Sequence, residues 1–216
     1  MIIGSIVLVL ASMYGGDSLG SWFTFEIGGV VYEDGVVETE NWTTERVYSP
    51  FKTSVNFMLT EYEVELEMDG ESNDEKSDYD DSDAIFCDSD CDELNDLMIG
   101  KIQNLLYVVI LAGFAALYFL NQDDEEKGAM ACLAMGGAGL LAVGMFTLSF
   151  PEALDDDQNS FSEIGEDPSL FGDESVDEAG QFEGDATWRP GLAFALVGLS
   201  GILGMAAYQK LNSESP

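Results

Sequence analysis

Residues 101–150 read KIQNLLYVVILAGFAALYFLNQDDEEKGAMACLAMGGAGLLAVGMFTLSF, and this stretch decides the fold. It contains two runs without Asp, Glu, Lys or Arg, residues 102–120 and 129–150, joined by the polar octet NQDDEEKG. A helix of about 19 residues is about 28 Å long, close to the hydrocarbon thickness of a bilayer. Because so short a connector makes two helices antiparallel neighbours, the sequence predicts a transmembrane hairpin with spans at 101–120 and 129–150 and a turn at 121–128.

The charge of the chain is concentrated outside these apolar runs. The 216 residues include 42 acidic and 7 basic side chains and no histidine, for a net charge of −35. The acidic residues gather in segments 17–99 and 151–189, so the mean hydropathy of +0.05 describes neither the spans nor the connectors. With no basic patch and no phosphate-binding glycine pattern, nucleic acid is not expected as a partner.

Two further apolar segments lie at the ends of the chain. Residues 1–14, MIIGSIVLVLASMY, would form a helix of about 21 Å, which spans a bilayer only if it continues through Gly15 and Gly16. A cleaved signal peptide is the alternative, but the segment lacks a positively charged start, which favours a first span over residues 1–16. Residues 190–208 form the fourth span, and 209–216 a short polar tail.

The connector at 17–100 divides into a β-rich part and an acidic part. Residues 22–68 alternate apolar and polar side chains, most clearly in EYEVELEM at 61–68, and Gly28 and Gly29 predict a bulge. Residues 69–96 have too little apolar material to form a core and are expected to be an acidic loop, as are residues 151–189. The predicted fold is therefore membrane α+β: a four-helix transmembrane bundle with a small antiparallel sheet in the first extracellular loop.

Small residues in the third and fourth spans predict how these helices pack. Small side chains let helix backbones approach closely in lipid, where hydrophobic contrast cannot drive association. The alternative is that glycine and alanine are simply common in membrane helices. The residues expected to form the contact are spaced four apart in the third span and three apart in the fourth: Ala134, Ala138, Ala142, Gly198, Gly201 and Gly204.

The orientation of the spans follows from loop chemistry rather than from basic residues. Lys127 and Lys210 lie on one side and Lys101 and Arg189 on the other, so counting them decides nothing. The two large connectors share a side, which carries a glycosylation acceptor sequence beginning at Asn41 and two close cysteines. We therefore expect a multi-pass cell-membrane protein with both large loops outside and both termini in the cytoplasm.

This layout resembles the claudin-type tetraspan membrane proteins, in which a large outer loop built as an antiparallel sheet carries a tryptophan followed by a cysteine pair. Trp42 would match the tryptophan, and Cys87 and Cys91 the pair. The Gly-Leu-Trp element of those families is absent at Trp42, and the two cysteines lie only four residues apart, close to the second span. The resemblance implies a role in membrane contacts or as a companion subunit of another membrane protein.

Cys87 and Cys91 can be interpreted in two ways. Carboxylates at positions 88, 90 and 92 disfavour a thiolate, which a redox pair needs. A structural disulfide is therefore the favoured interpretation for a segment outside the cell. Cys132, within the third span, is expected to be an inert packed thiol.

The acidic second loop contains one window with calcium-ligand spacing. Residues 155–166 place oxygen-bearing side chains at positions 1, 3, 5, 9 and 12 of a calcium-binding loop, namely Asp155, Asp157, Asn159, Glu163 and Glu166. Ser160 stands where that loop requires glycine. Calcium is thus a possible ligand, but solvated acidic loops are the favoured interpretation.

The sequence favours interaction over catalysis. No Asp, Glu, Lys, Arg or His lies inside the apolar spans, whereas such residues mark proton and ion pathways in membranes. We expect a non-enzymatic membrane protein without a cofactor, in contact with the lipid bilayer and with another membrane protein or its own copies. The alternative is an envelope sensor whose acidic loops bind divalent cations.

Overall fold

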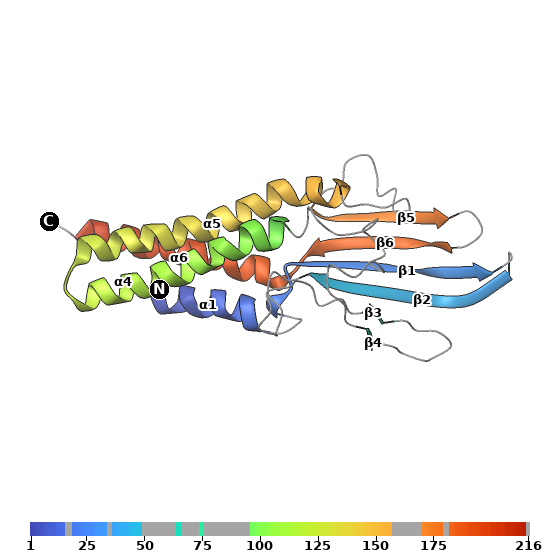
Figure 1. Ribbon diagram of the computed structural model, residues 1–216, viewed down its shortest axis with the longest axis horizontal. Helices are drawn as coiled ribbons and strands as arrows, with labels where there is room; N and C mark the ends of the chain where they lie inside the picture. The colour runs from blue at the N-terminus through green and yellow to red at the C-terminus, as the bar shows by residue number, and fades with distance from the viewer. Residues whose placement is uncertain are drawn as a thin grey trace.

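The computed structural model describes residues 1–15, 19–33, 36–48, 64–65, 74–75, 96–156, 170–178 and 182–214. The described part is elongated, with helices at one end and a sheet at the other (Figure 1). The α-helices of the described part are α1 (Ile2–Tyr14), α4 (Asn104–Asn121), α5 (Glu125–Asp156) and α6 (Leu192–Glu214), and the π-helix η1 (Asp96–Gln103) leads directly into α4. α1 packs against α4 and α6, and α5 packs against the same two helices.

Among the described residues, three helical stretches are long and apolar enough to cross a bilayer, judged by length and composition: Asp96–Asn121, Glu125–Ala153 and Leu192–Ser213. They correspond to the second, third and fourth predicted spans. α1 has only 13 residues and ends at Tyr14 instead of continuing through Gly15. At about 20 Å it covers only the half of the bundle next to the sheet, and its first residue lies partway along the bundle (Figure 1).

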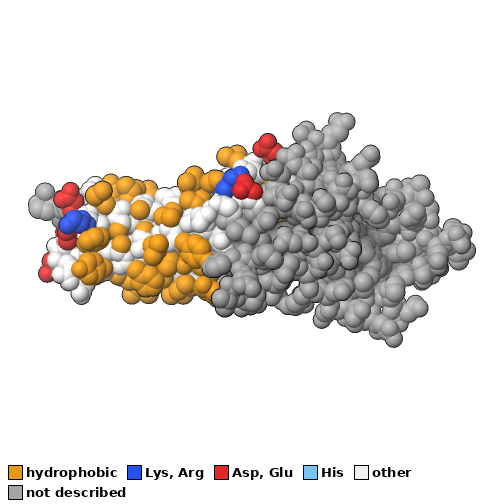
Figure 2. Space-filling view, in the orientation of Figure 1, with side chains coloured by type: hydrophobic (Ala, Val, Ile, Leu, Met, Phe, Trp, Pro, Cys, Tyr) orange, Lys and Arg blue, Asp and Glu red, His pale blue; other side chains and the backbone are white. Residues whose placement is uncertain are grey.

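The outer surface of the bundle is an apolar belt. Large apolar side chains are exposed on every α-helix, including Ile3, Val7, Leu111, Phe114, Tyr118, Met130, Leu141, Leu148, Leu199 and Ile202. Figure 2 shows acidic and basic side chains at the two ends of this belt. The uncharged part of the second span, between Lys101 and Asp123, is about 30 Å long. This length matches the hydrocarbon thickness of a bilayer.

The turn between α4 and α5 is tighter than the predicted octet, because α5 already begins at Glu125. Asp123 adopts a left-handed backbone (φ 56°). Its N–H donates to the carbonyl of Leu120 (3.2 Å), and the N–H of Asp124 donates to that of Phe119 (3.0 Å). This pattern ends α4. The Asp124 carboxylate then accepts from the backbone N–H of Lys127 (3.2 Å), which caps the start of α5.

The sheet is antiparallel and has the strand order β2-β1-β6-β5. Its strands are β1 (Phe23–Glu33), β2 (Val36–Tyr48), β5 (Gly172–Glu178) and β6 (Phe182–Pro190). No strand is expected from the sequence of residues 151–189, yet β5 and β6 form there, where β6 pairs with β1 and β5 pairs with β6. The sheet is therefore built from both acidic connectors and not from the first alone.

The bulge expected at Gly28 and Gly29 has a counterpart in the β1–β2 register. The pairing shifts between Gly29 and Val31, and again between Val31 and Tyr32, with the extra residues on β2. β3 (Val64–Glu65) and β4 (Asp74–Glu75) form a separate two-stranded ladder. The rest of the strand predicted at 61–68 lies outside the described residues.

Candidate functional site

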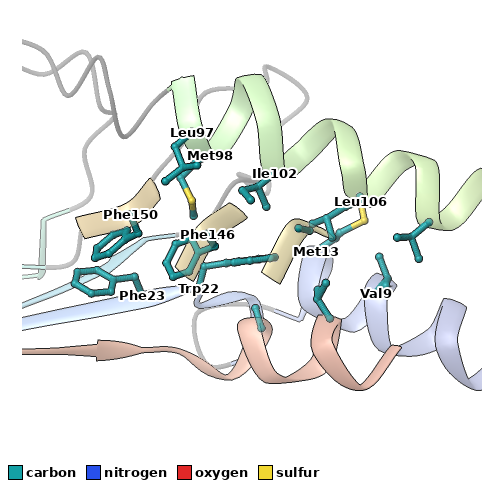
Figure 3. Close-up of a cluster of buried hydrophobic side chains, with 14 of the residues drawn as sticks. Val9, Met13, Trp22, Phe23, Leu97, Met98, Ile102, Leu106, Phe146 and Phe150 are labelled. Atoms are coloured by element: carbon teal, nitrogen blue, oxygen red, sulfur yellow. The ribbon is translucent and has the colours of Figure 1, made fainter. Parts of the chain in front are cut away.

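The junction between bundle and sheet is an aromatic cluster. Trp22 and Phe23, at the start of β1, are fully buried against Phe146 and Phe150 near the end of α5 (Figure 3). The ring centroids of Trp22 and Phe146 are 5.4 Å apart, and those of Phe23 and Phe150 are 4.1 Å apart. Each such pair contributes about 0.5–1.5 kcal/mol beyond its buried area. The sheet is thus seated on the end of the bundle by packed rings.

Backbone hydrogen bonds reinforce this junction at the start of α6. The N–H groups of Gly191 and Ala193 donate to the carbonyls of Trp22 and Ser21, each at 2.8 Å. A Cβ atom at Gly191 would overlap Ser21, so this close approach requires glycine. Because β6 ends at Pro190 and α6 begins at Leu192, the strand continues into the helix with a single residue between them.

The two faces of β6 differ in burial. Glu183, Asp185, Thr187 and Arg189 alternate along the strand and are all exposed. Trp188, on the opposite face, is 6% exposed. Its ring lies directly over Gly172 of β5, where any Cβ atom would overlap it.

The exposed face of β6 carries two carboxylates, Glu183 and Asp185. The backbone register pairs Asp185 with Ser175 of β5. On the same face, Asp185 accepts a hydrogen bond from the Ser175 hydroxyl (2.9 Å). We call this surface, defined by Glu183 and Asp185, the acidic sheet face.

Most of the predicted ligand residues lie outside the described residues, namely Cys87, Cys91, Asp157, Asn159, Glu163 and Glu166. Asp155 lies in the last turn of α5, and Asn41 lies in β2, an edge strand of the sheet. Within the described ranges, no group of three or more His, Cys, Asp or Glu side chains is arranged to hold a metal ion. Cys132 is a buried free thiol, packed with Ala116 and Ala207.

The glycines singled out in the fourth span lie against α5. A Cβ atom at Gly201 would lie 2.9 Å from the backbone nitrogen of Leu140, and one at Gly204 would lie 2.7 Å from the Cα of Gly136. At Gly198 the nearest contact of such an atom, with Val143, is an ordinary 3.7 Å.

The alanines of the third span are placed differently from the glycines. Ala138 and Ala142 are buried in the main core, whereas Ala134 is exposed. The α5 residues next to the α6 glycines are Gly136, Gly139 and Leu140.

A buried serine pair links α1 to α6, and the sequence gives little signal for it. The hydroxyl oxygens of Ser5 and Ser200 are 2.6 Å apart, and each lies within hydrogen-bond distance of the other residue's carbonyl oxygen, at 3.0 and 3.1 Å. Both side chains are fully buried. Serine is common among the small residues of membrane helices, so only the three-dimensional pairing distinguishes these two.

The described residues therefore form an exposed acidic surface on a sheet that packs against the end of the bundle. No sequence pattern identifies the residues that hold this sheet in place, which are Trp22, Trp188 and Gly172. Protein-family models and curated protein sequences were compared with the chain, and neither comparison found a match.

Proposed function

We propose that this is a non-enzymatic integral membrane protein that acts by interaction, presenting the acidic sheet face to a partner outside the membrane. The exposed carboxylates of Glu183 and Asp185 carry this proposal, since they stand on a sheet anchored to the bundle by buried aromatic rings. The apolar belt of the bundle supports a place in the cell membrane. In this arrangement both acidic connectors are extracytoplasmic and both termini are cytoplasmic.

The chemistry of the acidic sheet face favours a cationic partner. Glu183 and Asp185 are exposed on one face of β6, and basic side chains from a partner would complement their negative charge. The same charge disfavours a second copy of the chain on this face. Another membrane protein with a basic outer surface therefore fits best, either as a neighbour in a complex or across a membrane contact.

The placement of both connectors outside also bears on their cysteines and on Asn41. A disulfide between Cys87 and Cys91 is part of the proposal, because oxidising compartments stabilise such bonds. Asn41 would be a glycosylation acceptor on the same side.

The test is cross-linking in intact cells followed by purification in mild detergent. Replacing two carboxylates in Glu183→Gln/Asp185→Asn should lower the yield of the cross-linked partner, because the charge complementarity is reduced. The wild-type yield should also fall as ionic strength rises, since salt screens exposed charges.

A matched control removes two charges at the opposite end of the bundle. Glu125→Gln/Glu126→Gln should leave the yield unchanged, because these residues begin α5 on the far side of the apolar belt. An equal loss in both variants, or none in either, would contradict a role for the acidic sheet face.

A further inference from the structure

The π-helix η1 brings Leu97 into the core. Leu97 and Leu106 are nine residues apart, and an α-helix, at about 100° per residue, would place them on opposite faces. Both are nevertheless buried, with 1% and 0% of their surface exposed. The wider winding of a π-helix, with its i to i+5 hydrogen bonds, allows both side chains to face inward.

One polar contact at η1 fits the π winding and would not fit an α-helix, and two others accompany it. Asp96 and Lys101 form an ion pair at 2.8 Å, although residues five apart in an α-helix lie about 140° apart around the axis. A Cβ atom at Gly100 would lie 2.6 Å from the Asp96 carboxylate, so glycine leaves space for that group. The Asn104 side-chain amide donates to the Gly100 carbonyl (2.7 Å), at the point where π winding gives way to α winding.

We propose that η1 is a register latch between the sheet and the second span. In the π state the Asp96–Lys101 pair is closed and Leu97 packs in the junction. In the alternative α state the pair is separated and Leu97 turns outward, while Ile102, four residues before Leu106, stays on the core face. Two-state elements of this kind can carry conformational coupling between sites.

The junction is where the latch would act. Leu97 and Met98 belong to the same buried cluster as Trp22 and Phe146, the residues that seat the sheet (Figure 3). A change of register in η1 would therefore alter the surface on which β1 rests. The latch couples the sheet to the bundle whatever the identity of the partner.

Cysteine labelling with a membrane-impermeant thiol reagent tests the latch in the full chain in lipid nanodiscs. Leu97→Cys and Ile102→Cys serve as separate reporters, each in a chain whose three native cysteines are replaced by serine. Lys101→Gln removes the ion pair, and Gly100→Ala places a methyl group against Asp96. Each should speed labelling at position 97 by about tenfold and leave it slow at position 102, because Ile102 is buried and stays on the core face in the α register.

Lys127→Gln is the matched control, because it breaks the Asp124–Lys127 ion pair at the other end of the bundle. It should change neither rate. Faster labelling at both positions would mean that η1 simply unfolds, which overturns the proposal. Unchanged labelling in both η1 variants, or an equal response to Lys127→Gln, would overturn it as well.

Discussion

Asp124 lies between α4 and α5 and takes part in the hydrogen bonds that end the first helix and begin the second. Its backbone N–H helps to end α4, while its carboxylate caps α5 and pairs with the Lys127 ammonium at 2.6 Å. The hydrogen bond from the Lys127 side chain, and after it that from the Lys127 backbone, holds the pKa of Asp124 below its usual range. The turn of the hairpin is therefore set by one partly exposed residue.

The lowered pKa of Asp124 predicts a pH dependence with a defined sign. Because the folded-state pKa lies below the unfolded-state pKa, the stabilisation is present above the usual Asp range and is lost as pH falls through the folded-state pKa. At neutral pH, Asp124→Ala should lower the melting temperature in detergent more than Asp124→Asn, because asparagine still caps a helix. The differences should shrink in acid. A gap between wild type and Asp124→Ala that persists in acid would contradict this role of the carboxylate.

Gly201 is predicted to be indispensable to the α5–α6 contact. In Gly201→Leu the new side chain would begin 2.9 Å from the Leu140 backbone nitrogen, which cannot move without shifting α5. We expect a loss of about 1–3 kcal/mol, the usual cost of overpacking, measured as a lower melting temperature in detergent.

Leu199 provides the control for that substitution, since it is on the same helix and 47% exposed. Leu199→Ala should change the melting temperature little, because only lipid contact is lost. Equal melting temperatures for wild type and Gly201→Leu would show that α6 does not depend on this close approach.

Among the elements, the helical hairpin was the most predictable from sequence. Two uncharged runs of membrane length and a short polar connector leave few alternatives. β5 and β6 were not predictable in this way. Their sequences, GDESVDE and FEGDATWRP, are rich in acidic residues and glycine, which strands usually lack. They form because β6 pairs with β1, a contact between segments more than 150 residues apart.

The contacts between α5 and α6 could be predicted from the sequence only in part, for a geometric reason. Ala134, Ala138 and Ala142 recur every fourth residue, and such a row drifts by about 40° per step around an α-helix. The row therefore passes from the exposed side of α5 at Ala134 to the core at Ala142. The sequence indicates that small residues pack, but not which of them meet.

The serine pair between α1 and α6 allows a quantitative prediction. Ser5→Ala and Ser200→Ala should each lower the unfolding free energy, and the double mutant should lose less than the sum. Hydrogen bonds between membrane helices give coupling energies of about 0.6 kcal/mol on average and up to about 1.7 kcal/mol. Chemical unfolding in detergent would measure the double-mutant cycle.

Ser12 supplies the control for this cycle, because it is equally buried but donates within its own helix, to the Val9 carbonyl at 2.7 Å. Ser12→Ala combined with Ser200→Ala should be additive. Additive losses for Ser5 and Ser200 would show that their hydrogen bonds contribute nothing specific to the α1–α6 contact.

At the scale of the whole molecule, the sheet and the bundle form one continuous body. β6 passes into α6 across Gly191, η1 passes into α4, and the end of α5 packs on the start of β1. Charged pairs mark both ends of the apolar belt, Asp96–Lys101 next to the sheet and Asp124–Lys127 at the hairpin turn. The belt therefore fixes how far the sheet stands from the bilayer.

The proposed orientation predicts which segments a protease can reach from outside. A protease recognition sequence inserted after Asn159 should be cut when intact cells are treated with the membrane-impermeant enzyme, because that connector shares the side of the sheet. The same sequence inserted after Gln122, in the hairpin turn, should be cut only after the cells are permeabilised. An inserted site is needed at the turn because its capped, hydrogen-bonded backbone would resist cleavage on either side of the membrane. Cleavage after Gln122 but not after Asn159 in intact cells would place the sheet in the cytoplasm, and the acidic sheet face would then have to find its cationic partner there.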